Sequence, residues 1–397
     1  MINYDSLLSD QVKRMQPSGI RKFFDVAAMM EGVISLGVGE PDFQTPWVVR
    51  KEAVDILERK RIIYSANSGM MNLRKEIANY LNRKYDLTYD SNSEVIATVG
   101  GSEAIDLAIR AIVNPGDEVL VVEPSFVCYK PIVELMHGVA VPIPTKEENK
   151  FKLTPEELQA HITEKTKMLI LPYPNNPTGG IMTREDLEKI AAVLRGTNIL
   201  VLSDEIYSEL TYGTKHCSIA SIPDMWERTI YVSGFSKAFA MTGWRLGYLI
   251  GPAEVIEHAK KVHDFLTVGA PAPLQEAACV GVRFPQSYYK ELTALYTRKR
   301  DVFLKGLDRL GLKHNVPQGT YFVLLDISDF LALDRFQGWS DLEFCEWMIR
   351  EIGVAAVPGS SFFREPVNHL IRLHFARSEE TLEQALDRLA KLAALLH

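Results

Sequence analysis

The chain has 397 residues, of which 47% are apolar and 24% charged, with a formal net charge of −7, so it is long enough for roughly two or three domains. The acidic balance and the lack of a Lys/Arg run exclude a nucleic-acid or anionic-membrane surface, and no segment reaches the ~20 apolar residues that span a bilayer. The N-terminus has no signal-peptide pattern and the four cysteines lack metal-ligand spacing, so we expect a cytoplasmic protein with free thiols and no metal site.

Short apolar runs alternate with helical patterns between about residues 50 and 250. The runs do not alternate with polar residues, which is typical of strands buried on both faces. They are expected as strands at 95–99, 119–122, 168–171, 199–202 and 229–232, with helices such as 102–113 and 184–194 between them. This order predicts an α/β fold with a mainly parallel, doubly wound sheet.

The C-terminal third has the pattern of a second, smaller α/β unit. It is expected to contain a long helix at 287–310, strands at 321–327, 354–357 and 370–375, and an amphipathic helix at 378–396. We therefore expect an N-terminal segment (1–45) that packs with a small domain (286–397), and a large domain (46–285).

Unusual residue clusters follow several predicted strands, and open α/β sheets bind ligands beyond the carboxyl ends of their strands. Gly100 and Gly101 come between a strand and a helix start, a setting that suits a phosphate, although plain turn chemistry gives the same pattern. Phe126 follows the next strand, where its ring would stack on an aromatic cofactor or pack in the core.

Two further clusters lie after later strands. The proline-rich loop 172–180 would present the amide of Asn176 to a ligand, and its Asn176–Pro177 bond is a candidate cis peptide. Asp204 ends a buried strand, where a carboxylate needs a partner such as a protonated pyridine nitrogen; a helix N-cap is the alternative. Tyr207 would reach the same ligand, and we expect Glu205 to be structural.

Lys237 and Arg245 share one loop of small and apolar residues. An apolar setting beside another cation lowers the pKa of a lysine until its neutral amine attacks a carbonyl, and an arginine fork suits a phosphate. The pair indicates a Schiff-base lysine beside a phosphate-bearing aldehyde, which is pyridoxal phosphate. In the strand at 370–375, Arg372 either faces solvent or grips a substrate carboxylate.

These clusters resemble the class I/II aminotransferases, the fold-type I pyridoxal-phosphate enzymes, over essentially the whole chain. The branch with the most similar pattern is the bacterial and archaeal one that holds alanine, aspartate and aromatic aminotransferases. The matching motifs are Gly37–Phe43, Tyr64 with Gly69 and Leu73-Arg74, the Asn-Pro-Thr-Gly loop, Asp204 with Tyr207, Ser236-Lys237 with Gly243-Trp244-Arg245, and Arg372.

The resemblance implies a role for each of these residues. Lys237 would form the internal aldimine and carry the α-proton. Asp204 would pair with the pyridine nitrogen, Tyr207 and Asn176 would bond the phenolic oxygen, and Phe126 would stack on the ring.

The same resemblance implies that phosphate is held by Gly101, Ser102, Glu103, Ser236 and Arg245. Arg372 would take the substrate α-carboxylate, assisted by Asn176 and the Gly39 backbone. Tyr64 would reach the phosphate of the neighbouring subunit, so a homodimer is expected.

The implied reaction is ping-pong transfer of an amino group from an L-amino acid to a 2-oxo acid such as 2-oxoglutarate. A neutral or aromatic donor is favoured, because aspartate-specialised relatives can carry a lysine at the position of Ser102. Phe23 and Phe24, expected near the entrance, fit this preference or form an ordinary amphipathic helix.

Three alternatives remain open at this point. Aspartate aminotransferase is the nearest of them. A pyridoxal-phosphate-dependent carbon–sulfur lyase on the same fold would release pyruvate and ammonia without an acceptor. The effector-binding module of a transcription regulator would need a DNA-binding domain, for which the residues before the sheet leave little room.

Overall fold

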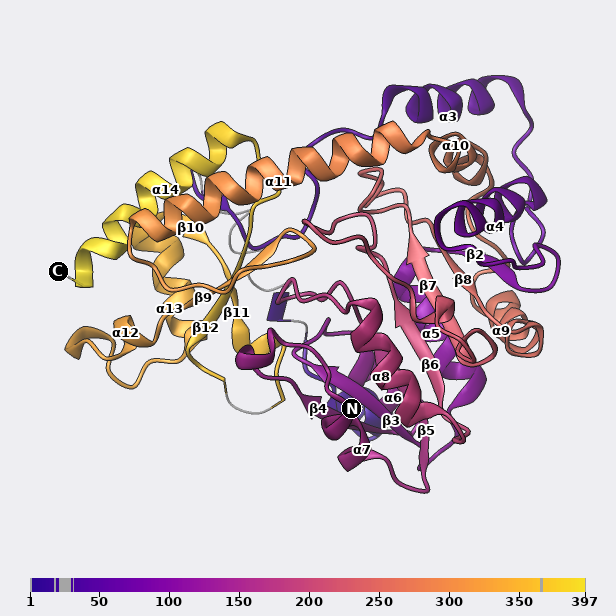
Figure 1. The fold of residues 1–397 in the computed structure, drawn as a ribbon, viewed down its shortest axis with the longest axis horizontal. Helices are drawn as coiled ribbons and strands as arrows, with labels where there is room; N and C mark the ends of the chain where they lie inside the picture. Colours follow the sequence, from indigo (N-terminus) through magenta and orange to yellow (C-terminus); the bar gives the residue numbers. More distant parts are fainter. Residues whose placement is uncertain (1, 18, 21–29, 31, 365–366, 397) are drawn as a thin grey trace.

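The computed structural model describes residues 2–17, 19–20, 30, 32–364 and 367–396, which form two lobes (Figure 1). The larger lobe is built on a seven-stranded sheet and the smaller on a three-stranded sheet. Within these described ranges no helix combines the length and apolarity needed to cross a membrane. All four cysteines are free, as predicted.

The large sheet has the strand order β2-β8-β7-β6-β5-β3-β4. Its strands are Val95–Thr98 (β2), Glu118–Glu123 (β3), Val139–Pro144 (β4), Thr166–Leu171 (β5), Leu200–Asp204 (β6), Thr229–Gly234 (β7) and Gly247–Ile250 (β8). Strands β4, β3, β5, β6 and β7 are successive parallel neighbours, whereas β8 is antiparallel to both β7 and β2. The predicted mainly parallel sheet is confirmed.

Two strands of this sheet are not predicted from the sequence, β4 and β8. β4 lies at the sheet edge and contains Pro142 and Pro144, which weaken the strand signal. β8 has only four residues and begins at Gly247, directly after the loop of Lys237. Both strands therefore depend on their neighbours in the sheet more than on local propensity.

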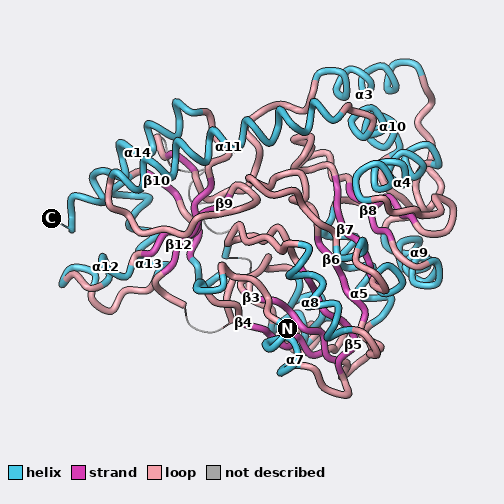
Figure 2. Tube along the Cα trace, viewed as in Figure 1, coloured by secondary structure: helices cyan, strands magenta, loops and turns pink. Residues whose placement is uncertain are grey.

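Helices cover both faces of the large sheet, as Figure 2 shows. Along β3, Val119 and Val121 pack in one apolar cluster with α5 (Gly101–Ile112) and α6 (Tyr129–Leu135), while Leu120 and Val122 pack in another with α7 (Pro155–His161) and α8 (Arg184–Leu194). This burial on both faces explains the unbroken apolar runs of the sequence. The helices of the larger lobe are α3 (Trp47–Arg59), α4 (Met71–Tyr85), α5 (Gly101–Ile112), α6 (Tyr129–Leu135), α7 (Pro155–His161), α8 (Arg184–Leu194), α9 (Ala253–Leu266) and α10 (Ala272–Val282), and the short α1 (Asp10–Arg14) contacts α6.

The smaller lobe is an antiparallel sheet of order β11-β12-β9, with β9 at Phe322–Asp326, β11 at Val357–Pro358 and β12 at Leu370–His374. Its helices are α11 (Gln286–Arg309), α12 (Ser328–Leu331), α13 (Asp341–Trp347) and α14 (Glu379–Ala393). The prediction of a single strand at 354–357 is wrong. Val354–Ala355 forms β10, which pairs in parallel with β1 (Ile34–Ser35), whereas Val357 belongs to β11 and pairs with β12. The expected division at 285/286 falls between α10 and α11 and stays a prediction.

Candidate active site

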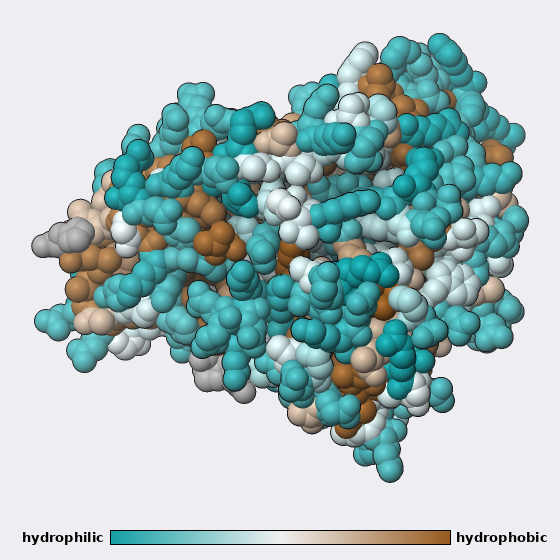
Figure 3. Space-filling model, viewed as in Figure 1, coloured by the Kyte–Doolittle hydropathy of each residue, from teal (hydrophilic) through white to brown (hydrophobic). Residues whose placement is uncertain are grey.

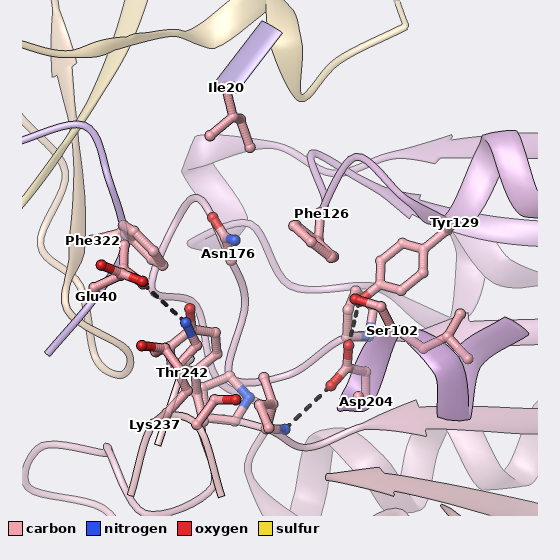
Figure 4. Close-up of a pocket in the computed structure, with 18 of the residues that line it drawn as sticks. Ile20, Glu40, Ser102, Phe126, Tyr129, Asn176, Asp204, Lys237, Thr242 and Phe322 are labelled. Carbon is pink, nitrogen blue, oxygen red and sulfur yellow. Dashed lines mark hydrogen bonds between the residues drawn. The ribbon is translucent and has the colours of Figure 1, made fainter. Parts of the chain in front are cut away.

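A cavity of about 360 Å³ lies where the carboxyl ends of the parallel strands meet the smaller lobe. It collects residues that are far apart in the chain, from the loops after β3, β5, β6 and β7, from the start of α5 and from β9 and β12. Its walls are Ile20, Gly39, Glu40, Gly101, Ser102, Ile105, Phe126, Tyr129, Pro172, Pro174, Asn176, Asp204, Ile206, Tyr207, Ser236, Lys237, Thr242, Arg245, Phe322 and Arg372 (Figure 4).

The start of α5 forms a cradle of donors in this wall. Gly101 and Ser102 are the first helical residues, so their backbone N–H groups have no partner within the helix. Gly100, before them, has φ +81°, and a Cβ there would lie 2.5 Å from Arg245 Nη2. The glycine therefore lets the guanidinium close over the helix start. Arg245 Nη1 donates to the Thr242 carbonyl at 2.9 Å, and Ser236 lines the same cavity.

Glu103 belongs to the same turn but is not among the cavity walls. Its carboxylate accepts from the backbone N–H of Val99 at 2.5 Å and from the hydroxyl of Thr267 at 3.0 Å. The side chain therefore stabilises the strand-to-helix turn, while its expected backbone role at a phosphate stays a prediction.

Lys237 is half-buried in the loop after β7. Its Nζ donates to the Gly39 carbonyl at 2.9 Å and lies 5.6 Å from the ring centre of Tyr207 and 5.9 Å from that of Tyr321. Burial lowers the pKa of this amine to about 8. The nearby cations Arg372 and Arg245 contribute to this lowering of the pKa, whereas Glu40 and Asp204 oppose it. The sequence pattern anticipates Arg245 but not the contribution of Arg372.

Asp204 is the last residue of β6 and is buried in the cavity wall. Oδ2 accepts from the Tyr129 hydroxyl at 2.7 Å and Oδ1 from the Ile206 N–H at 3.2 Å. Burial raises the pKa of this carboxyl to about 6, and the Tyr129 hydrogen bond opposes the rise. Asp204 thus caps a turn and faces the cavity. No helix begins at this point of the described chain, so the helix N-cap alternative is wrong, and the role as partner of a ring nitrogen stays a prediction.

Glu205, the next residue, serves a different contact network. Its carboxylate accepts from Ser218 Oγ and from His216 Nε2, both at 2.6 Å, and the side chain is not among the cavity walls. These bonds tie the end of β6 to the segment that follows it. The geometry agrees with a structural role.

Arg372, on β12, is 2% exposed, so the solvent-facing alternative is wrong. Its guanidinium lies between the rings of Phe322, at 4.1 Å, and Phe362, at 4.7 Å. Nη1 donates to Asn176 Oδ1 at 2.6 Å and Nη2 to the Gly37 carbonyl at 2.7 Å. Burial lowers the pKa to about 10, so the group stays cationic at neutral pH.

The other predicted residues are placed as follows. Asn176 faces Arg372, and the cis bond expected at Asn176–Pro177 is confirmed. Phe126 and Tyr207 line the cavity.

Tyr64 is 89% exposed on a different surface of this chain. Phe23 and Phe24 lie outside the described residues.

Sequence reasoning misses several residues that the fold brings to the cavity. Tyr129 sits three positions after Phe126, a spacing that places both on one side of a helical turn and is the signal available in the sequence. Tyr321 is fully buried and donates to the Gly39 carbonyl at 2.7 Å. Glu40 lies within the Gly37–Phe43 motif without a predicted role, and three further cavity walls have no local motif: Ile20, Thr242 and Phe322.

Comparison with known proteins gives the family. The sequence profile of the class I and II aminotransferases matches residues 31–389. The chain belongs to this family. The aminotransferase is 44% identical over 386 residues to the putative aminotransferase YugH of Bacillus subtilis, covering 97% of this chain and 98% of that protein.

Other relatives of the aminotransferase agree with this assignment. The aspartate aminotransferase of Pyrococcus abyssi is 40% identical over 97% of this chain and 98% of its own length. A solved structure of a Thermus thermophilus aspartate aminotransferase single mutant superimposes with a TM-score of 0.89 at 35% identity, covering 97% of this chain and 99% of that one. The predicted fold is therefore confirmed, and the protein is a transaminase of a family that uses pyridoxal phosphate.

Proposed function

We propose that the protein transfers an amino group from a neutral or aromatic L-amino acid to a 2-oxo acid such as 2-oxoglutarate, in a ping-pong cycle that depends on Lys237. The observation that carries the proposal is the meeting of Lys237, Asp204 and Arg372 in one cavity. An amine of lowered pKa, a buried carboxylate and a buried arginine are the three groups that this reaction needs.

The donor set fits pyridoxal 5'-phosphate. The helix start at Gly101 and Ser102, with Ser236 and Arg245, offers N–H, hydroxyl and guanidinium donors for a phosphate. Asp204 would hold a protonated ring nitrogen, Asn176 and Tyr207 the phenolic oxygen, and Phe126 the ring face, as the family resemblance implies. When bound, the cofactor supplies an aldehyde that accepts the amino group and a ring that takes up electrons from the substrate's α-carbon.

The chain's own residues bind the substrate and move its proton. Arg372 would bind the α-carboxylate in parallel hydrogen bonds, since its guanidinium is a cavity wall and has five N–H groups, of which two bond Asn176 and the Gly37 carbonyl. Lys237, as a neutral amine, would remove the α-proton and return it, acting as base and then acid. The Gly39 carbonyl, which accepts from Lys237 at 2.9 Å, would orient that amine.

Substrate choice is tested by a panel of amino donors with 2-oxoglutarate, following the oxo acids formed. Ser102 gives the start of α5 no cationic side chain of its own for a second carboxylate, and Arg245 is assigned to the phosphate, so we expect alanine and phenylalanine to give higher kcat/KM than aspartate. A strong preference for aspartate would replace the proposal with the alternative that the P. abyssi relative's name suggests. Release of pyruvate and ammonia without an acceptor would indicate a lyase.

Gly100→Ala should weaken pyridoxal phosphate binding about tenfold, because the new Cβ meets the Arg245 guanidinium and strains a backbone at positive φ. The dissociation constant is measured by titrating the cofactor-free protein and following absorbance. Gly196→Ala is the matched control: its φ is +77°, but no atom lies within 4 Å of the Cβ position. It should show the same kind of strain with unchanged cofactor affinity; equal weakening in both variants would contradict the phosphate role.

We also propose that the working unit is a homodimer. The outer face of α3 and the segment after it expose a group of several apolar side chains: Trp47, Val48, Val54, Leu57, Ile62, Ile63 and Tyr64. In the view of Figure 3, the region of α3 shows scattered hydrophobic residues among hydrophilic ones. A second copy that covered this group would bury Tyr64 at the interface, in accord with its role in the family. Sedimentation equilibrium would give the monomer mass if the proposal is wrong.

A further inference from the structure

Tyr129 contacts the candidate machinery, although its spacing of three residues from Phe126 is the one sign of this in the sequence. Its hydroxyl donates to Asp204 Oδ2 at 2.7 Å, and its side chain is 2% exposed (Figure 4). The residue begins α6, and its ring packs edge-on against Phe126 with the centroids 6.2 Å apart. The hydroxyl is therefore fixed by packing as well as by its hydrogen bond.

Tyr129 supplies the shorter of the two hydrogen bonds that Asp204 accepts. The other comes from the N–H of Ile206, two residues further along the chain, at 3.2 Å. Within the described ranges, Tyr129 is thus the donor that ties this carboxylate to an element other than its own strand end. Without it, the carboxylate would be buried with one long hydrogen bond, and rotation of the side chain would be less restricted.

The remaining titratable groups around Asp204 do not replace this bond. Glu205, next in the chain, disfavours the ionised carboxylate, and Lys237 from the loop after β7 favours it. The thiol of Cys128 and the hydroxyl of Tyr207 also feel the carboxylate's charge. None of these four side chains donates a hydrogen bond to Asp204 in the described structure.

We propose that Tyr129 is a positioning residue whose hydroxyl keeps the Asp204 carboxylate ionised and directed at the protonated ring nitrogen of the cofactor. The proposal rests on the proposed function. Its physical basis is that a hydrogen bond to the charged form of a buried acid stabilises that form. Burial raises the pKa of Asp204 to about 6, and the Tyr129 bond opposes that rise; loss of the hydroxyl therefore raises the pKa further.

Tyr129→Phe tests the inference because it removes one oxygen and keeps the ring. In cofactor-free protein with ¹³C-labelled aspartate, the Asp204 carboxyl signal is assigned by its absence in Asp204→Asn and titrated with pH. We expect its midpoint to move upward by about one pH unit in Tyr129→Phe. An unchanged midpoint would overturn the proposal. This readout needs no cofactor and no activity, so it separates failure of the inference from failure of the proposed function.

The loaded enzyme gives a second readout in the pH dependence of kcat/KM. Tyr129→Phe should lose several-fold more activity at about pH 6 than at about pH 8.5, because the carboxylate of the variant protonates first on the acid side. A loss equal at every pH would mean that the hydroxyl is merely structural, and would contradict the inference.

Two further variants separate positioning from folding. Tyr212→Phe removes another buried hydroxyl, one that bonds to the Thr320 carbonyl, and should lower stability without moving the acid limb of the pH profile. In an Asp204→Asn background, Tyr129→Phe should cause less than a twofold further loss, since its effect passes through the missing carboxylate. Full additivity of the two losses would overturn the proposal.

Discussion

Replacing Lys237 with alanine should abolish transamination, lowering kcat by about 10⁴-fold or more, because no other described amine of the chain lines the cavity. The variant should still bind pyridoxal phosphate weakly through the phosphate cradle. Borohydride reduction followed by mass spectrometry should label the wild-type peptide that contains residue 237 and leave the variant unlabelled.

Lys237→Arg is the control for charge. It keeps a cation beside Gly39 but cannot supply a neutral amine, so it should be as inactive as the alanine variant. If either variant turned over at the wild-type rate, another group would be the proton carrier and the proposed function would be wrong.

The pH dependence of cofactor incorporation follows from the same residue. The neutral amine is the nucleophile, and burial lowers its pKa to about 8. The rate at which cofactor-free protein takes up pyridoxal phosphate should therefore rise with pH and level off above about 8. A rate that kept rising to the pKa of a free lysine would show that the amine is not desolvated.

Arg372→Lys should lower kcat/KM for amino donors by about 100-fold, with cofactor affinity unchanged. The lysine keeps the charge but cannot donate in parallel to a carboxylate while it also bonds Asn176 and the Gly37 carbonyl. Stopped-flow measurement of the half-reaction with alanine, over a range of concentrations, separates weaker binding from slower chemistry.

Arg74→Lys is the matched control for this change. Arg74 is also buried and also donates to backbone carbonyls, those of Gly69 and Ser91, but it is not a cavity wall. It should lose stability and keep its kcat/KM. If both substitutions lowered kcat/KM alike, the loss would reflect packing, and the carboxylate role of Arg372 would be contradicted.

Much of the larger lobe is predictable because its strands carry a signal that burial alone determines. β3, β5, β6 and β7 each contain an unbroken run of apolar residues, since both faces of the sheet are covered by helices. β8 has no such signal: it is short, and it forms because the chain after Lys237 is returned between β2 and β7. In the smaller lobe, the apolar run at 354–357 gives no sign that it is shared between two sheets.

The candidate site divides in the same way. Asp204, Lys237 and Asn176 stand out in the sequence because each lies at or just after the end of a buried strand. Burying a polar or charged side chain there is costly unless it has a partner. Tyr129 and Tyr321 do not stand out, because tyrosine is also common in hydrophobic cores. Only the tertiary structure shows which group each hydroxyl bonds. The register of β12 decides that Arg372 is buried between two aromatic rings.

By itself, the sequence determined the fold class, the family and the residues at the strand ends, because apolar periodicity and short motifs are local properties of the chain. Only the tertiary structure decided which of these residues lie together. It is the fold that lets Lys237 donate a hydrogen bond to the Gly39 carbonyl and the Tyr129 hydroxyl donate one to Asp204. The physical reason is that hydrogen bonding and desolvation depend on neighbours that lie scores of positions away, and folding is what brings those neighbours within a few ångströms.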